Sequence, residues 1–407
     1  MLRAHLPDAA SPLSYETVTA MVAPGGYRLE IAEVAAYEFR RTLDGRHFGP
    51  NARWTERRIP IVRITTRDGQ TGMGEGWCEQ EAISLFFDQL RSLAPYLLGG
   101  DARLIEQHWQ TAWSLQSAET PDWIPPAVTS AVDIALWDLR ARGFGASVHE
   151  LLGPQRDAVP VYASGGLYAN GKGPAELAAE MQGLVERGFY AVKLKIGRME
   201  RDADLARVAA VREAVGPQVE ILVDAGECLT TGEAPAMIRR LAELGVTAIQ
   251  APLPVTDVPG LLMLNRTGRL RVLVGESEWR VARFRELLRA GAVGVLQLNP
   301  GLCGGITQTL KLAALAEAHD VPVCLQNHST AVLLAACLQI GAARGAVAAV
   351  EVHGFHDHLH ELLPTQMLQP RDGCLAPDAP GLGLPERMQA SRGDIRLIWR
   401  LRAGEAG

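Results

Sequence analysis

The sequence predicts an α/β fold: a closed (β/α)8 barrel of the TIM type that follows a smaller α+β domain. Short β-branched runs recur from about residue 160 onward, with helical stretches such as Ala175–Glu186 and Ile306–Ala318 between them. Their repeat of roughly 22–30 residues is the length of a strand plus its crossover helix. Eight runs are strand-like, at Val159–Ser164, Ala191–Ile196, Glu220–Asp224, Thr247–Gln250, Val272–Gly275, Val293–Leu298, Val321–Leu325 and Ala348–Val352. Eight such units predict a closed parallel barrel, whose reactive groups gather where the strands end.

The region before the barrel has a different pattern. Ile61–Thr66 and Gln70–Trp77 are strand-like and flank Asp68-Gly69, a strong hairpin signal. Helical stretches follow at Glu81–Leu97, Ala102–Ser114 and Val128–Arg142. We therefore expect a separate α+β domain over residues 27–155, after an N-terminal extension of residues 1–26. The barrel would span residues 156–354, and residues 355–407 have too few elements to fold alone, so we expect them to return to the first domain.

The composition excludes several classes of protein. With 407 residues, of which 47% are apolar and 21% charged, the chain can bury a large core. A net charge of −6 without basic runs argues against a nucleic-acid partner. The six cysteines form no CxxC pair, which favours reduced thiols over a zinc cluster or disulfides. The first twenty residues lack a signal-like apolar run, and Thr330–Val352 contains Gln339 and Arg344, so we expect a cytoplasmic protein without a membrane span.

Three side chains with oxygen atoms end successive predicted strands: Asp224, Gln250 and Glu276. Consecutive barrel strands end beside one another, so these groups can converge on one point. A hard cation such as Mg²⁺ prefers oxygen ligands. The sequence thus predicts one Mg²⁺ site; the alternative is that each residue is an ordinary capping or solvated group.

Lys193 and Lys195 stand two residues apart on the preceding strand. A side-chain period of two points both into the barrel. Each ammonium, with the metal nearby, disfavours protonation of the other, so one lysine could have a lowered pKa suited to a general base. The alternative is a pair of salt bridges to Asp224 and a neighbouring acid.

Three further polar groups lie across the predicted barrel. His328 follows the seventh strand, Asn299 ends the sixth and Glu351 lies on the eighth. A histidine opposite the lysines could protonate a leaving hydroxyl or the other face of a carbanion, although a histidine in such a loop is often structural. Farther on, His353, His356, His358 and His360 lack the spacing of a zinc site, and we interpret them as surface or interface residues.

Five segments together resemble the mandelate racemase and muconate lactonizing branch of the enolase superfamily. They are Ser130–Arg140 (SAVDIALWDLR), Val192–Gly197 (VKLKIG), Val223–Gly226 (VDAG), Val274–Ser277 (VGES) and Cys303–Thr307 (CGGIT). The match runs from about residue 27 to the end of the chain, in the family's order and spacing. The resemblance implies a modified barrel, an N-terminal capping domain whose loops close over the site, and one Mg²⁺ held by three acids. A symmetric homo-oligomer is also implied by the resemblance alone.

Mapped onto this chain, the resemblance implies specific roles. Lys195 would be the base and Lys193 its electrostatic partner. Asp224 and Glu276 would bind the metal, His328 would act as acid or base on the opposite face, and Glu351 would contact the substrate carboxylate. Capping-loop contacts would lie within the polar stretch Arg40–Arg58.

Two positions depart from the family pattern. Gln250 stands where the second acidic ligand is expected, so one negative charge is lost and the metal should bind more weakly, unless Glu227 or Glu278 compensates. Asn299 stands where mandelate racemase-like members have an aspartate beside the histidine. An amide can orient His328 but does not stabilise an imidazolium as a carboxylate does, so His328 should be a weaker base.

These features predict an enzyme that removes the proton next to a carboxylate. A cation and ammonium groups placed there stabilise the developing ene-diolate, and sites of the enolase superfamily use a Lys or His base together with Mg²⁺. A weakly basic His328 favours loss of a β-hydroxyl, so we expect a hydro-lyase, a dehydratase acting on a small hydroxy-carboxylate such as an acid sugar. A racemase or epimerase is the alternative, and a binding protein with an impaired metal site is a third possibility.

Overall fold

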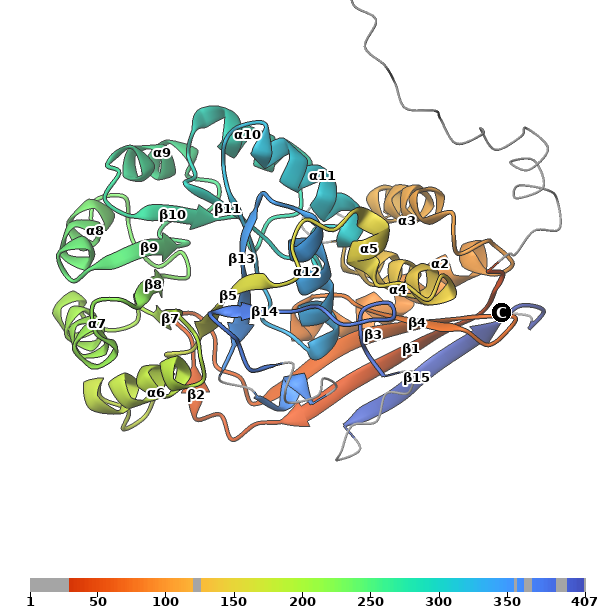
Figure 1. The fold of residues 1–407 in the computed structure, drawn as a ribbon, viewed down its shortest axis with the longest axis horizontal. Helices are drawn as coiled ribbons and strands as arrows, with labels where there is room; N and C mark the ends of the chain where they lie inside the picture. Colours follow the sequence, from red (N-terminus) through yellow and green to blue (C-terminus); the bar gives the residue numbers. More distant parts are fainter. Residues whose placement is uncertain (1–28, 120–125, 355–356, 362–367, 386–393, 406–407) are drawn as a thin grey trace, which may run out of the picture.

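The computed structural model describes residues 29–119, 126–354, 357–361, 368–385 and 394–405. These residues form a barrel and a flatter sheet-and-helix domain that lie side by side (Figure 1). The expected N-terminal extension lies outside the described residues, as does His356. Within them, no helix is both long and apolar enough to cross a membrane.

The barrel contains eight parallel strands in sequence order around one closed sheet. They are β5 (Val159–Ser164), β7 (Ala191–Lys195), β8 (Glu220–Asp224), β9 (Val246–Gln250), β10 (Arg271–Val274), β11 (Val295–Leu298), β12 (Val323–Leu325) and β13 (Val347–His353). Strand β13 pairs with β5 and closes the cylinder, and the short β14 (Cys374–Leu375) adds antiparallel to β5. The predicted eight-stranded barrel is confirmed, with strand bounds close to those expected.

Seven helices follow the first seven barrel strands in the part of the chain that the structure describes. They are α6 (Pro174–Glu186), α7 (Arg201–Val215), α8 (Ala234–Glu243), α9 (Val258–Arg266), α10 (Val281–Ala290), α11 (Gly305–Glu317) and α12 (Ala331–Ala343). After β13 the described residues form no α-helix; the 3-10 turn η2 (Asp357–His360) comes next. The barrel is therefore a modified form, with seven helices observed around eight strands.

Alternation along each strand sorts side chains between two cores. On β8, Ile221 and Val223 join the core between sheet and helices, whereas Leu222 points into the cylinder. Six inward residues from different strands fill the barrel: Tyr162, Leu222, Ala248, Leu273, Val295 and Cys324. This apolar layer closes the inside of the barrel. The polar residues two positions later on the same strands therefore lie at the open carboxyl end.

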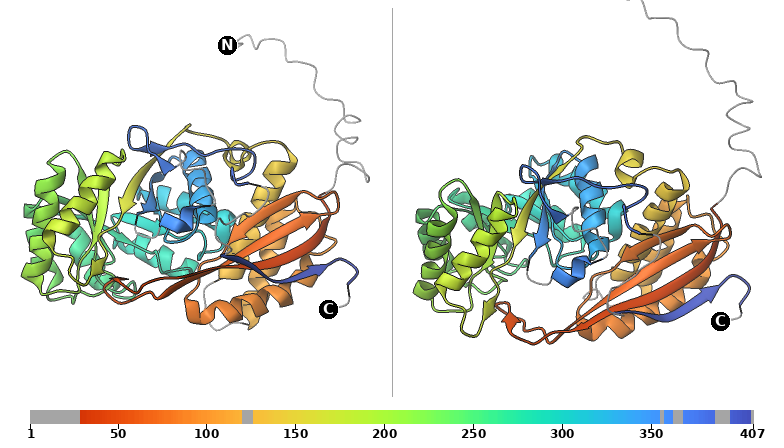
Figure 2. Two further views of the ribbon diagram at one scale, coloured as in Figure 1. Left: turned by 90° about the horizontal axis from the view of Figure 1, so that it is seen from below. Right: turned by 60° about the horizontal axis from the view of Figure 1, so that its bottom comes forward.

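The capping domain is a four-stranded antiparallel sheet covered by helices on one face (Figure 2). Its strands are β1 (Ile31–Thr42), β3 (Glu56–Thr66), β4 (Thr71–Glu75) and β15 (Ile395–Arg402). The helices are the 3-10 turn η1 (Gln80–Ala82), α2 (Ile83–Leu97), α3 (Ile105–Glu119), α4 (Ala127–Gly143) and α5 (Val148–Leu152). The β3–β4 hairpin and the three long helices match the prediction, whereas β1 and β15 were not anticipated. Strand β15 comes from the end of the chain and pairs with β1 along the sheet edge.

Several contacts join the capping domain to the barrel. The short strand β2 (His47–Phe48) pairs with β6 (Tyr168–Ala169), which follows the first barrel strand. Asp133 of α4 accepts hydrogen bonds from the backbone and hydroxyl of Thr307, at the start of α11, at 2.9 and 2.5 Å. The Trp109 indole donates to the Gly304 carbonyl at 2.8 Å. The segment after β2 also reaches the barrel loops, because Asn51 donates to the Gly226 carbonyl at 2.6 Å and Arg198 donates to the Pro50 carbonyl at 3.1 Å.

The packing of β4 on α4 predicts one sensitive position. A Cβ at Gly74 would lie 1.9 Å from the Ala131 carbonyl oxygen of α4, so Gly74→Ala must push backbone apart. We expect a loss of about 1–3 kcal/mol in the free energy of unfolding, measured by urea titration. Gly183→Ala is the matched control, because a Cβ there meets nothing within 4 Å and the residue lies inside α6. Equal stability of the two variants would contradict this account of the packing.

Candidate active site

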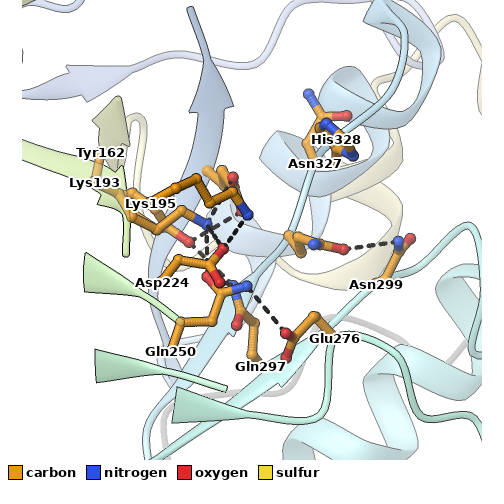
Figure 3. Close-up of polar contacts among 12 residues, drawn as sticks. Tyr162, Lys193, Lys195, Asp224, Gln250, Glu276, Gln297, Asn299, Asn327 and His328 are labelled. Carbon is orange, nitrogen blue, oxygen red and sulfur yellow. Dashed lines mark hydrogen bonds and ion pairs between the residues drawn. The ribbon is translucent and has the colours of Figure 1, made fainter. Parts of the chain in front are cut away.

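Polar side chains from successive barrel strands meet at the carboxyl end of the cylinder (Figure 3). Lys195 pairs in register with Asp224, and Asp224 with Gln250, so these residues occupy the same level of three neighbouring strands. Glu276 follows β10, and its carboxylate accepts a hydrogen bond from the Gln250 amide at 3.1 Å. The expected convergence of these strand ends is therefore observed.

Lys193 is a fully charged, buried member of the ring. Its side chain is 2% exposed, and its Nζ lies 2.9 Å from Glu351 and 3.6 Å from Asp224. It also donates to the Gln250 amide oxygen at 2.6 Å. Burial opposes the charge, but the carboxylates of Glu351 and Asp224 outweigh it and raise the pKa of Lys193 above its ordinary value. Lys193 is therefore not a lysine with a lowered pKa, and the expectation of one such lysine in the pair stays a prediction.

Lys195 is the accessible member of the lysine pair. Its side chain is 20% exposed, and its Nζ donates to Asp224 at 2.5 Å. Both lysines contact the same carboxylate, so they share one face of β7 as the period of two predicts. The salt bridges that we considered as the alternative for this pair are present in the structure, to Asp224 and Glu351.

The two carboxylates of the expected metal site have different electrostatic environments. Burial would raise the pKa of Asp224, but the ammonium groups of Lys195 and Lys193 hold that pKa below its usual range. For Glu276, burial and the negative charge of Asp224 raise the pKa to about 7. The Glu276 side of the ring is therefore short of positive charge, and a cation there would relieve the repulsion.

Gln250 is bound at both ends of its amide. Its oxygen accepts from Lys193 at 2.6 Å and from Gln297 at 3.2 Å, while its nitrogen faces Glu276. A nitrogen that donates a hydrogen bond cannot bind a metal, and the oxygen is turned to the lysine. Asp224 and Glu276 thus suit a hard divalent cation, whereas Gln250 in this orientation links Lys193 to Glu276.

The two acids that might replace the missing charge accept local hydrogen bonds. Glu278 is buried and accepts from the Arg280 guanidinium and from the backbone of Trp279 and Arg280, at 2.8–2.9 Å. Glu227 accepts from the Val255 backbone at 3.4 Å. Glu278 is therefore held by Arg280 and the local backbone, whereas compensation by Glu227 stays a prediction.

Two residues of the ring were missed by the sequence reasoning. Gln297 on β11 donates to Tyr162 on β5 as well as to Gln250, and the Tyr162 hydroxyl donates to Glu351 at 3.3 Å. Glu351 therefore contacts Lys193 and Tyr162, where we expected a contact with substrate. The alternation of inward and outward side chains along a strand could have predicted Gln297, because it lies two residues before Asn299 and so on the same inward face.

His328 and Asn299 do not form the expected pair. The Asn299 amide donates to Gln326 at 2.9 Å and accepts from the Gly301 backbone at 3.0 Å. The Nε2 of His328 instead lies 3.4 Å from the guanidinium of Arg57, at the start of β3 in the capping domain. Arg57 belongs to the polar stretch from which capping-loop contacts were expected.

The border between the capping domain and the barrel contains open space. A cavity of about 550 Å³ is lined by Trp77 and Phe86 of the capping domain and by Trp279 and Leu302 of the barrel loops. A smaller one of about 120 Å³ is lined by Trp54, Arg57 and His328, among others. A cleft between domains next to ionisable groups is the usual place for a small-molecule site.

Comparison with known families agrees with this architecture. Residues 176–390 match the enolase C-terminal domain-like family, and residues 51–153 match the mandelate racemase / muconate lactonizing enzyme N-terminal domain. The chain belongs to the enolase superfamily. The predicted membership of its mandelate racemase and muconate lactonizing branch is confirmed.

Three enolase superfamily relatives illustrate the similarity. Arabinonate dehydratase of Saccharolobus solfataricus is 29% identical over 80% of this chain and 87% of its own. A 3,6-anhydro-alpha-L-galactonate cycloisomerase of Streptomyces coelicolor is 33% identical over 79% of this chain and 87% of its own. The structure of L-talarate dehydratase from Polaromonas sp. JS666, complexed with Mg and L-glucarate, superposes with a TM-score of 0.79 at 27% identity, covering 93% of this chain and 99% of the other.

The raised pKa of Glu276 predicts how stability depends on pH in this enolase superfamily member. The Glu276 carboxyl titrates near pH 4.5 in the unfolded chain and near pH 7 in the folded protein. Its contribution to the free energy of unfolding is therefore complete below pH 4.5 and is lost as the pH rises through 7. In protein treated with a chelator, raising the pH from about 5 to about 8 should cost on the order of 2 kcal/mol at this partly exposed group.

Glu276→Gln tests this pH dependence. The variant keeps a neutral group of the same shape, so it should lack this component of the pH dependence, measured by urea unfolding at the two pH values. The same loss of stability in the wild type and Glu276→Gln would show that Glu276 titrates normally.

Proposed function

We propose that this protein is a dehydratase that removes water from a hydroxylated carboxylic acid of the acid-sugar class. The observation that supports the first step is the lysine pair. Lys193 is buried and held as an ammonium, whereas Lys195 is partly exposed at the mouth of the barrel. Lys195 is therefore the group that can meet a substrate and, as the neutral amine, accept the proton from its α-carbon.

The surrounding charges suit the intermediate of such a reaction. Removing a proton next to a carboxylate places negative charge on the carboxylate oxygens, and fixed positive groups stabilise that charge more than the ground state. Lys193 supplies one such charge, because Glu351 and Gln250 hold its ammonium in place. Asp224 and Glu276 would hold Mg²⁺, which supplies further positive charge for the enolate when bound.

His328 lies away from the lysines across the barrel mouth (Figure 3). Its strand β12 is separated from β7 by β13 and β5. In the proposed reaction Lys195 takes the α-proton on one side of the substrate. On the other side His328 gives a proton to the β-hydroxyl as its C–O bond breaks, so that it leaves as water. This two-sided arrangement suits elimination of water.

The relatives support dehydration over the alternatives. Arabinonate dehydratase and the L-talarate dehydratase structure are named for loss of water from an acid sugar. Isomerisation is the second candidate, because two relatives are named cycloisomerases. The mass of the product distinguishes the two reactions, since a dehydratase product is lighter by one water and an isomerase product is unchanged.

Lys195→Met tests the role of the base. Incubated in deuterated buffer with Mg²⁺ and a panel of aldonic and aldaric acids, the wild type should incorporate deuterium at an α-carbon or release a keto acid detectable with a carbonyl reagent. The variant should lose at least about 10³-fold of that rate, because methionine cannot accept the proton. NMR and mass spectrometry measure both products.

Lys311→Met is the matched control for this experiment. Lys311 is an exposed lysine of α11 that pairs with Glu106, so its loss should leave the rate unchanged. Unimpaired exchange in Lys195→Met on a substrate that the wild type turns over would refute the proposed base.

Gln250→Glu tests the metal site. A carboxylate at this position adds one ligand charge near Asp224 and Glu276, so Mn²⁺ used as a probe should bind at least about tenfold more tightly, measured by electron paramagnetic resonance. Mg²⁺ should also raise the thermal midpoint of the variant more than that of the wild type.

Gln250→Met separates the two possible roles of the wild-type amide. If Gln250 only links Lys193 to Glu276, removing its oxygen leaves Mn²⁺ affinity within about twofold. A marked loss of affinity in Gln250→Met would show that the amide oxygen turns to the metal.

A further inference from the structure

Arg57 is a capping-domain residue that contacts His328 of the barrel. It is 5% exposed and lies at the start of β3. One of its terminal nitrogens, Nη2, donates to the His328 backbone carbonyl at 2.6 Å, and the other, Nη1, lies 3.4 Å from Nε2 of the His328 ring. The guanidinium therefore contacts both the main chain and the ring of the same residue.

The chemistry of this contact limits the state of the ring. A guanidinium has only donors and stays charged at neutral pH. Burial lowers the pKa of Arg57 to about 10, which still leaves it protonated. The ring nitrogen that faces Arg57 must therefore offer a lone pair. An imidazolium would set a second N–H and a second positive charge against the guanidinium.

Neighbouring rings hold the imidazole in this orientation. Trp54 of the capping domain meets the His328 ring edge-on at 5.5 Å between centroids, and His353 of β13 meets it at 6.2 Å. His353 is itself fixed, because its Nε2 lies 2.8 Å from the Ser329 carbonyl and its ring stacks on His360. Both His353 and His360 are buried, so the surface alternative in our interpretation of them as surface or interface residues is wrong. Arg57 from β3 and His353 from β13 are thus two charged or titratable groups that lie against the His328 ring.

Asn299, the residue expected to orient the His328 ring, makes its hydrogen bonds to other groups. Asn299 is hydrogen-bonded to Gln326 and to the Gly301 backbone. A histidine whose tautomer matters takes it from the group bound to its other nitrogen. Here the capping domain supplies that group, across the domain border.

We propose that Arg57 is the positioning residue of His328: its guanidinium donates to the lone pair of Nε2 and so keeps the resting imidazole neutral, with its proton on Nδ1. The inference rests on the proposed function only in giving His328 a part in the reaction. In that reaction the neutral His328 gives its Nδ1 proton to the departing hydroxyl, Arg57 facing Nε2 stabilises the charge left on the ring, and the ring then regains a proton from solvent. This requires Arg57 of the capping domain to be in place.

The test is an NMR measurement on substrate-free, full-length protein labelled with ¹⁵N-histidine. Long-range ¹H–¹⁵N spectra distinguish the Nδ1–H tautomer, the Nε2–H tautomer and the imidazolium, and the His328 signals are assigned by their loss in His328→Gln. In the wild type at neutral pH, His328 should show a protonated Nδ1 and an unprotonated Nε2. In Arg57→Met the Nε2–H tautomer should appear, and the ring should titrate about one pH unit higher or more.

Two further variants separate positioning from folding. Arg53→Met removes a nearby cation that donates to the Gly45 carbonyl and lies over Phe48, so it should leave the His328 spectrum unchanged. Arg57→Lys keeps a charged donor and should keep His328 mainly as the Nδ1–H tautomer. If wild-type His328 is an imidazolium or an Nε2–H tautomer, or if Arg57→Met leaves its tautomer and titration unchanged, the proposal is overturned. Failure of the Lys195 exchange experiment alone would remove the proposed function without changing this result.

Discussion

The buried ammonium of Lys193 is the constraint on which the rest of the site depends. A charge inside the barrel is tolerated only with close partners, because the cost of desolvating it unpaired is several kcal/mol or more. Glu351 from β13, Asp224 from β8 and the Gln250 oxygen from β9 supply them. The ammonium thereby binds three strands together at the open end. Lys195, one pleat farther along the same face, is left at the mouth, where a proton can be exchanged with a ligand.

Gln250 suits this network because an amide is an acceptor at one end and a donor at the other. Its oxygen meets the ammonium and its nitrogen meets Glu276, whereas a glutamate would set two carboxylates against each other. With Glu276 neutral, the charges of Lys193 and Lys195 balance those of Asp224 and Glu351 without an ion. A divalent cation must then displace a proton from Glu276, so metal binding and pH are linked at this site.

The sequence predicted the features that depend on a local residue pattern. It did not predict the contacts between segments far apart in the chain. The eight barrel strands were found because buried parallel strands are short β-branched runs, and the ring residues because strand ends converge. Strands β1 and β15 were missed, since β15 is half exposed and pairs with residues more than 350 positions away. The direction in which the Gln250 amide points, and the meeting of Arg57 with His328, likewise depend on packing between elements far apart in the chain.

The two halves of the site thus have different structural origins. The lysine half, with Lys193, Lys195, Asp224 and Glu351, lies wholly on barrel strands and needs only the closed cylinder. The histidine half is shared, because the ring of His328 belongs to the barrel while Arg57 and Trp54 belong to the capping domain. Contacts such as β2 with β6 hold the two domains in register. In the proposed reaction, changes at the domain border would therefore act on the step that involves His328, whereas the groups proposed for proton removal lie on barrel strands.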